Sequence, residues 1–309
     1  MKLIACEPGA WSAREGLRGK ANLTIRADTM RRTAPTLESY RITDGIVVIR
    51  VGGIMLTRPD FVDQFLGGFT DRRDITRQVE LASVDNAVKA IVLRVDSPGG
   101  SVDGLAELGD AVRAAARRKP TIGQVEGMAA SAAYYAIAGA SEIVAGRMDM
   151  VGSVGTILVV YDASEAAQSA GLRVVPITSG KFKATAAFGT PLTADEQAYL
   201  QGIVDSYFAD FRRTVMSGGG RFIGPAEWSE VSDGRVFVAG EAKRLGLVDK
   251  FGRMGDTVAA LARLADDSQR TRARVQRQSL AVGEMDARGR VVDRVGKQRA
   301  ALQLAELRR

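Results

Sequence analysis

Ser131 is the residue of this chain whose neighbours best suit nucleophilic chemistry. It lies in the small-residue run Ala129–Ala133, where the flanking alanines leave room for a peptide backbone to approach. A serine hydroxyl is a weak nucleophile until a neighbouring base takes its proton, and the usual base is histidine. Because the 309 residues include no histidine, the base must be a lysine, a carboxylate or an amino terminus. Serine–lysine pairs are a known variant of the serine triad.

Backbone N–H groups near Ser131 are candidates for binding the negative charge that develops on an attacked carbonyl oxygen. Free N–H groups at the start of a helix favour negative charge, so the N–H of Ala132 is one candidate donor. A second is expected from the turn signal Asp96–Gly100, where glycine lets a substrate come close. Taken alone, the first segment is also explained as a small-residue helix packed on a sheet, and the second as a plain tight turn.

Two lysines, Lys181 and Lys183, follow a predicted strand and are candidates for the base. A lysine acts as a base only when it has lost its proton, which burial favours by lowering the pKa of the amine. Either lysine is also explained as an ordinary surface charge. The residue pattern alone does not choose between them.

Alternating strand and helix patterns predict an α/β domain with a largely parallel sheet. The expected strands are 46–51, 90–95, 121–125, 142–145, 156–160 and 172–177. The expected helices are 71–81, 102–118, 128–140, 163–170 and 193–216, the last with a capping box formed by Thr193 and Glu196. We predict three parts: an irregular arm at 1–40, a catalytic domain at 41–267 and a tail at 268–309.

The net charge of +7 belongs to the tail. Residues 268–309 hold eleven basic and four acidic residues and no aromatic residue, whereas the first 267 residues are neutral overall. This composition predicts a partly disordered or helical tail. A neutral body is not expected to bind nucleic acid.

Four motifs, taken in order, resemble the SppA-type serine peptidases, a family that includes signal peptide peptidase A and head-maturation proteases of tailed phages. The motifs are Asp96–Gly100, Ala130–Tyr135, Val151–Gly155 and Ser179–Lys183. The resemblance extends from about Ile42 to Leu264. It implies the ClpP/crotonase fold, with repeated ββα units, and a Ser/Lys dyad.

The resemblance also assigns roles to individual residues. Ser131 is the expected nucleophile and Lys183 the general base, with Ser153 positioning the lysine amine. The N–H groups of Gly100 and Ala132 are the expected oxyanion hole. The family often has two glycines after its serine, where this chain has alanines; Ala132 keeps its N–H, but the added methyl groups narrow the site. No cofactor and no metal are implied.

We therefore expect a serine endopeptidase that works through an acyl-enzyme intermediate, as a phage or prophage head-maturation protease acting on capsid scaffold. One alternative is a soluble SppA-type peptidase that degrades signal peptides or membrane-derived peptides. Others are an inactive capsid or scaffold protein, or a crotonase-type acyl-CoA enzyme. Expected partners are a peptide or protein substrate, further copies of the chain in a ring or dome, and capsid scaffold or portal proteins.

The expected location is the bacterial host cytoplasm or the phage prohead. No run approaches the roughly 18 apolar residues of a membrane span, and the start lacks the apolar core of a signal peptide. Cys6 is the only cysteine, which excludes an intrachain disulfide.

Overall fold

A ten-stranded sheet organises the residues that the computed structural model describes, namely 4–6, 41–59, 68–218 and 223–265. The strands are β1 (Ile4–Cys6), β2 (Ile42–Thr43), β3 (Ile46–Leu56), β4 (Phe69–Asp71), β5 (Ala90–Ser101), β6 (Thr121–Ala130), β7 (Glu142–Ala145), β8 (Met150–Gly152), β9 (Val236–Val238) and β10 (Lys250–Phe251). The helices are α3 (Arg72–Val84), α4 (Leu105–Ala116), α5 (Ala132–Ala138), α6 (Ser164–Ser169), α7 (Ala194–Met216), α8 (Pro225–Val231) and α9 (Ala239–Arg244).

The central strands of the sheet run parallel to one another. The main order is β10-β7-β6-β5-β3-β2, and every neighbouring pair from β10 to β3 is parallel. Beyond this path, β8 pairs in parallel with β6 and in antiparallel with β9. The predicted α/β class with a largely parallel sheet is confirmed.

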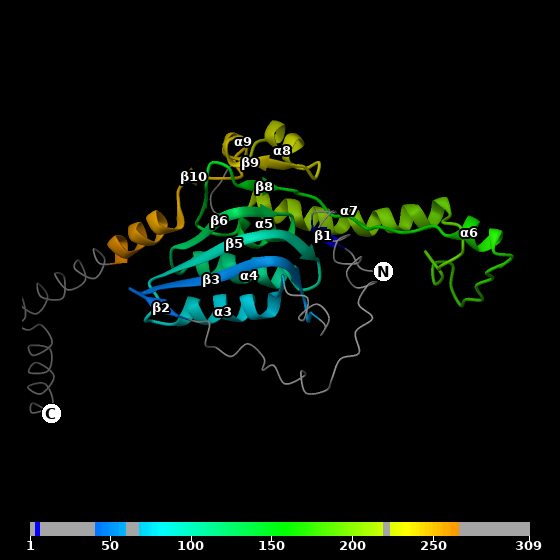
Figure 1. Cartoon of the computed structure of the whole chain (residues 1–309), viewed down its shortest axis with the longest axis horizontal. Coiled ribbons are helices and arrows are strands. Elements are labelled where there is room, and N and C mark those ends of the chain that lie inside the picture. Colours follow the sequence, from blue (N-terminus) through cyan, green and yellow to red (C-terminus); the bar gives the residue numbers. More distant parts are fainter. Residues whose placement is uncertain (1–3, 7–40, 60–67, 219–222, 266–309) are drawn as a thin grey trace, which may run out of the picture. The chain divides into compact units, whose positions relative to one another are not determined.

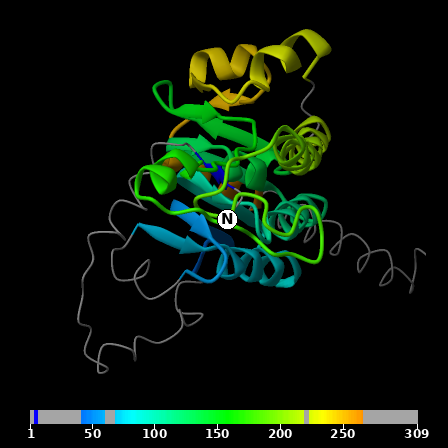
Figure 2. The ribbon, with the colours of Figure 1, turned by 90° about the vertical axis from the view of Figure 1, so that its right-hand side faces the viewer.

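The helices α3, α4, α5 and part of α7 cover one face of this sheet (Figures 1 and 2). The strands β3 and β5 begin with apolar runs, but Val48 and Arg50 of β3 and Arg94 and Asp96 of β5 are exposed, so the face of these strands away from the helices is only partly covered. Their side chains pack with apolar stripes of the helices into one core. Fully buried members of this core include Val47, Ile49, Leu93, Leu108, Val112 and Tyr134.

The long helix α7 begins where the sequence predicts. The Thr193 side chain accepts a hydrogen bond from the Glu196 N–H, and the Glu196 carboxylate accepts one from the Thr193 N–H. These two hydrogen bonds of the capping box give partners to backbone N–H groups that have none within the first turn of the helix.

Several predicted boundaries are wrong. The turn signal Asp96–Gly100 does not end its strand, because β5 continues to Ser101 with a register shift between Val95 and Ser97. The helix expected at 128–140 begins only at Ala132, because β6 continues to Ala130. The strands expected at 156–160 and 172–177 are absent from these described residues, apart from one isolated bridge at Ile157.

The structure describes only a small piece of the predicted arm and none of the predicted tail. Of the arm expected at 1–40, residues 4–6 form the strand β1, so this piece is not irregular. The tail expected at 268–309 lies outside the described residues. None of the described helices is long and apolar enough to cross a membrane.

Candidate active site

Ser131 is the single residue between strand β6 and helix α5, and its backbone is strained. Its φ of 52° and ψ of −119° place it among the positive-φ conformations that residues other than glycine rarely adopt. Two hydrogen bonds hold this turn: the Ser131 N–H donates to the Gly152 carbonyl over 2.8 Å, and the Tyr135 N–H donates to the Ser131 carbonyl over 2.9 Å. Such strain persists only where the surroundings impose it, and it is concentrated at functional sites.

Ser153 lies in the same pocket as Ser131 and has a similar backbone. Its φ is 51°, and its N–H donates to the Arg235 carbonyl over 2.7 Å. Five residues other than glycine have positive φ in the described part of the chain, and two of them are these serines. The shared pocket has a volume of about 450 Å³. The structure therefore brings together two of the predicted site residues, both nearly buried.

The predicted oxyanion donors lie on adjoining elements, Gly100 near the end of β5 and Ala132 at the start of α5. The register pairs Ser97 of β5 with Ala129 of β6, so the segments that lead to both residues are neighbours in the sheet. A Cβ atom at position 100 would overlap the Met55 carbonyl oxygen, so only glycine fits there. Ala132 is the first residue of α5, where N–H groups have no partner within the helix.

Ser97, which is fully buried, supports this turn. Its hydroxyl donates to the Gly53 carbonyl over 2.6 Å and accepts from the Gly99 N–H over 3.1 Å. The Gly99 N–H is thereby occupied, which leaves the next residue as the better candidate donor.

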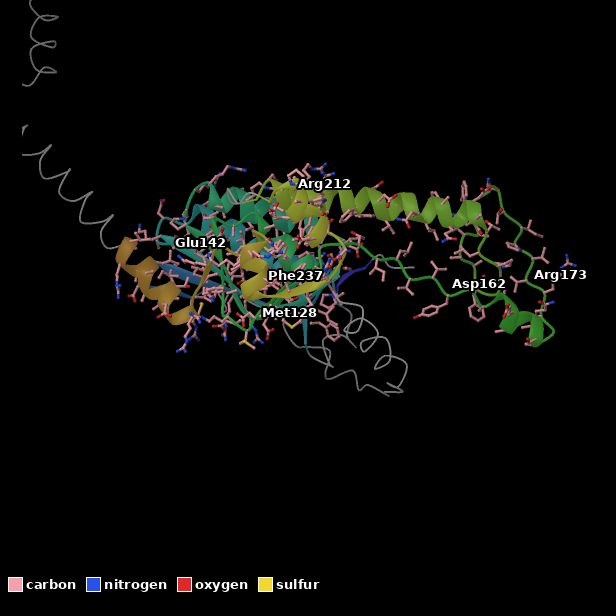
Figure 3. The ribbon with its side chains drawn as sticks, turned by 90° about the horizontal axis from the view of Figure 1, so that it is seen from above. Met128, Glu142, Asp162, Arg173, Arg212 and Phe237 are labelled. Atoms are coloured by element: carbon pink, nitrogen blue, oxygen red, sulfur yellow. The ribbon has the colours of Figure 1, made fainter. Side chains whose placement is uncertain are left out.

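The structure does not bring either candidate lysine to Ser131. Lys181 and Lys183 are exposed, and neither lines the pocket of Ser131. They belong to the segment 156–193, which packs along the N-terminal half of α7: Lys181 pairs with Asp195 at 2.6 Å, and Phe182 stacks on Tyr199. Figure 3 labels two residues of this segment, Asp162 and Arg173, well away from Met128 and Phe237 beside the sheet.

Two carboxylates do line the pocket of Ser131, those of Asp205 and Asp233. A hydrogen bond from the Arg235 side chain holds the pKa of Asp233 below its usual range. A carboxylate with a lowered pKa binds a proton weakly, so Asp233 is a poor candidate for the general base.

A second, mostly apolar pocket of about 300 Å³ adjoins the first, since Thr156 lines both. Its wall includes Val102, two residues after Gly100, and Tyr135, one helical turn after Ser131. The Tyr135 hydroxyl donates to the Asp210 carboxylate over 2.6 Å, and burial raises the pKa of this tyrosine to about 12. Sequence reasoning missed this pocket; the four-residue spacing from Ser131 to Tyr135 on a helix was the available signal.

The strand β1 pairs with the end of β5, where the predicted oxyanion donor Gly100 lies. It pairs in antiparallel with Gly99–Ser101, with Ala5 opposite Gly100. This edge of the sheet therefore accepts an extended chain segment directly beside Gly100.

The sequence matches two known peptidase families. The profile described as peptidase family S49 matches residues 113–268, about half of the chain. The profile described as Clp protease matches residues 69–150. These matches confirm the resemblance stated above, with its ClpP-like fold.

Individual relatives carry protease names. The chain is 33% identical over 184 residues to a putative protease of Methanocaldococcus jannaschii, covering 60% of this chain and 58% of that protein. It is 26% identical to a putative signal peptide peptidase SppA of Enterococcus faecium, covering 74% and 66%. It is 25% identical to the capsid assembly protease C of Escherichia phage lambda, covering 76% and 52%. The chain thus spans about half to two thirds of the length of these relatives.

Proposed function

The chain belongs to peptidase family S49, and on that premise we propose that it is a serine endopeptidase with Ser131 as its nucleophile. The observation that carries this proposal is the strained, nearly buried Ser131 between β6 and α5, in a pocket with Ser153 and beside the glycine turn of β5. A serine held in this way needs no reorganisation before it attacks.

The proposed base is Lys183, with Ser153 positioning its amine. Ser131 Oγ attacks the peptide carbonyl carbon while its proton passes to Lys183 Nζ, and the oxyanion accepts hydrogen bonds from the N–H groups of Gly100 and Ala132. The C–N bond then breaks as the ammonium returns the proton to the leaving amine. Water, deprotonated by the same lysine, attacks the acyl carbon, and the ester bond to Ser131 breaks as its oxygen regains a proton.

We infer that a second copy of the chain delivers this lysine. The segment 156–193 carries large apolar side chains that are almost fully exposed in a single chain: Tyr161 at 83%, Ile177 at 97% and Phe188 at 81%. Apolar surface of this kind is typical of a protein interface. A neighbouring copy that covers the segment would bring its own pocket to Lys183, which explains why the single chain holds the two groups apart.

The site suits a peptide bound in extended form. The antiparallel pairing of β1 with Gly99–Ser101 supports a substrate strand at the same edge, where main-chain hydrogen bonds would hold the scissile carbonyl beside Gly100. The pocket lined by Val102, Leu105 and Tyr135 would take an apolar substrate side chain. Both features favour cleavage of a peptide bond in the interior of a substrate chain, as an endopeptidase performs.

For the biological role we propose maturation of a phage or prophage head, with capsid scaffold or portal proteins as partners. Support comes from the similarity to the capsid assembly protease of phage lambda over 76% of this chain. The alternative, turnover of signal peptides or membrane-derived peptides, is supported by the similarity to the putative SppA. A purely structural role would not need the strained serine pair.

The test is hydrolysis of a denatured protein substrate and of capsid and signal-peptide segments by the full chain. Ser131→Ala serves as the control, and cleavage products are identified by mass spectrometry. Cleavage that disappears in the control is expected. Equal cleavage by both proteins would overturn the proposed nucleophile, and a marked preference for signal peptides would overturn the proposed role in the phage head.

A further inference from the structure

Arg72 is a fully buried arginine that the proposed mechanism does not use. It is the first residue of α3, and its side chain reaches the backbone at the ends of β3 and β5. The guanidinium donates to the carbonyls of Met55 over 3.2 Å, Ser101 over 2.5 Å and Asp103, and to the Thr57 hydroxyl over 3.1 Å. One side chain therefore joins the end of β3 to the chain that leaves β5.

These acceptors surround Gly100. Ser101 follows it in sequence, and Met55 lies opposite it in the β3–β5 register, with the carbonyl against which Gly100 packs. Asp103 lies in the connection between β5 and α4. The planar guanidinium donates in fixed directions, so its bonds hold the peptide group that follows Ser101 and the Met55 carbonyl on the neighbouring strand, and thereby restrict the backbone around Gly100.

If the Arg72 side chain only filled space, an apolar side chain would serve as well, and the positive charge would have no explanation. The carboxylates of Asp71, Asp103 and Glu107 are near enough to stabilise the cation, but no described residue forms an ion pair with Arg72 within 4 Å. Burial lowers the pKa of its guanidinium to about 10, so it stays charged at neutral pH. A buried cation is costly unless hydrogen bonds compensate it. Here the two terminal nitrogens make such bonds, to the end of β3 and to the chain that leaves β5, whereas Nε has no partner among the described residues.

We propose that Arg72 is a positioning residue that holds the Gly100 N–H in the direction required to bind the oxyanion. The proposal rests on the proposed peptidase function. Arg72 touches no substrate; it acts through the carbonyls of Met55, Ser101 and Asp103.

The test compares Arg72→Lys and Arg72→Met with a control, Arg94→Met. Arg94 also belongs to β5, but it forms an exposed ion pair with Glu126. Loss of one oxyanion donor lowers kcat by about 10²–10³, so a misdirected donor is expected to lower kcat by about 10- to 100-fold with KM nearly unchanged. Arg94→Met should leave both constants near wild type. Arg72→Lys keeps the charge and provides a folded variant if Arg72→Met does not fold.

Two further readouts separate positioning from general stability. A peptide aldehyde, which forms a tetrahedral adduct with the serine, should lose affinity in Arg72→Lys by the same factor as kcat, while a product peptide should not. Amide hydrogen exchange at Ser97–Val102 should accelerate in Arg72→Lys, with the rest of β5 unchanged. A kcat within twofold of wild type in Arg72→Lys would overturn the inference.

Failure of the proposed function would look different. In that case wild-type protein would hydrolyse the substrate no faster than Ser131→Ala does. Hydrogen exchange then still decides the inference about Arg72, because unchanged exchange at Ser97–Val102 would overturn it and selective acceleration there would support it.

Discussion

The region around Ser131 and the region around Lys183 differ in almost every physical respect. Ser131 and Ser153 are buried and strained in φ, and their N–H groups donate to Gly152 of β8 and to Arg235, just before β9. Lys183 is exposed, on a segment without strands beside the N-terminal half of α7. The proposed nucleophile is held by the core of one chain, whereas the proposed base is exposed to solvent.

This difference indicates how the site would be controlled. The proposed nucleophile and the backbone around Gly100 take their geometry from folding alone. A base on an exposed apolar segment gains its geometry only when another surface covers that segment. Folding and assembly would then be separate requirements for activity, and the predictions below test that separation.

The largest effect is expected from removing either member of the proposed dyad. Ser131→Ala and Lys183→Ala should each lower kcat/KM by at least about 10³-fold, since groups that act as a unit lose nearly everything with one deletion. Lys181→Ala is the matched control and should stay near wild type, because its partner is the exposed carboxylate of Asp195. If Lys181→Ala were inactive and Lys183→Ala active, the assignment of the base would be wrong.

Mixing the two inactive variants tests whether the lysine comes from another copy. In a mixed assembly of Ser131→Ala and Lys183→Ala chains, roughly a quarter of the sites combine an intact serine with an intact lysine from a neighbour. Activity should therefore return on mixing, after dissociation and reassembly. A mixture that stays inactive would show that serine and lysine come from the same chain.

The pH dependence distinguishes an amine base from a carboxylate base. A lysine must lose its proton before it can accept one, so kcat/KM should rise toward alkaline pH with a single ionisation on the rising limb. The pocket carboxylate of Asp233 has a pKa held low by Arg235. A rising limb below about pH 5 would therefore assign the base to a carboxylate and contradict the dyad.

The same comparison shows where sequence reasoning succeeds. Around Ser131, buried apolar runs predicted β3, β5 and β6, and the Thr193–Glu196 pattern predicted the start of α7. These patterns work because the core imposes the periodicity of burial on the sequence. The resemblance to the SppA-type peptidases also implied that Ser131 and Ser153 lie together, and the structure has both in one pocket; their catalytic roles stay a prediction.

Prediction from the sequence fails in segments whose structure is not determined by burial in the core. The β-branched runs at 156–160 and 172–177 predicted strands, yet they lie in the exposed segment, where no neighbouring strand completes the pairing. The positive φ of Ser131 has no local signal, because the surrounding fold imposes it. Arg72 resembles a surface arginine at a helix start, and only the tertiary contacts show its burial.

A moderate effect is expected from weakening β1. If the substrate pairs with Gly99–Ser101, then β1 must leave that edge before a peptide binds. Ala5→Pro removes the N–H and disfavours strand pairing, so KM for a peptide substrate should fall several-fold with kcat unchanged. Steady-state kinetics with and without the substitution give the answer. An increased KM would mean that β1 helps to build the binding edge.

The smallest effect is expected within the well-packed region, at Tyr135. Tyr135→Phe removes the hydrogen bond to Asp210, which should lower the free energy of unfolding by about 1 kcal/mol. Burial and Asp210 raise the folded-state pKa of Tyr135 from 10.0 to about 12. The folded state therefore holds this proton more tightly than the unfolded state, and the contribution is complete below pH 10 and lost as the pH rises through about 12. Urea unfolding should show wild type losing stability over this interval and Tyr135→Phe losing less. If the free energy of unfolding changed with pH equally in wild type and Tyr135→Phe, the Tyr135 hydroxyl would not be bound to Asp210. The well-packed region around Ser131 would then not include this side of the second pocket.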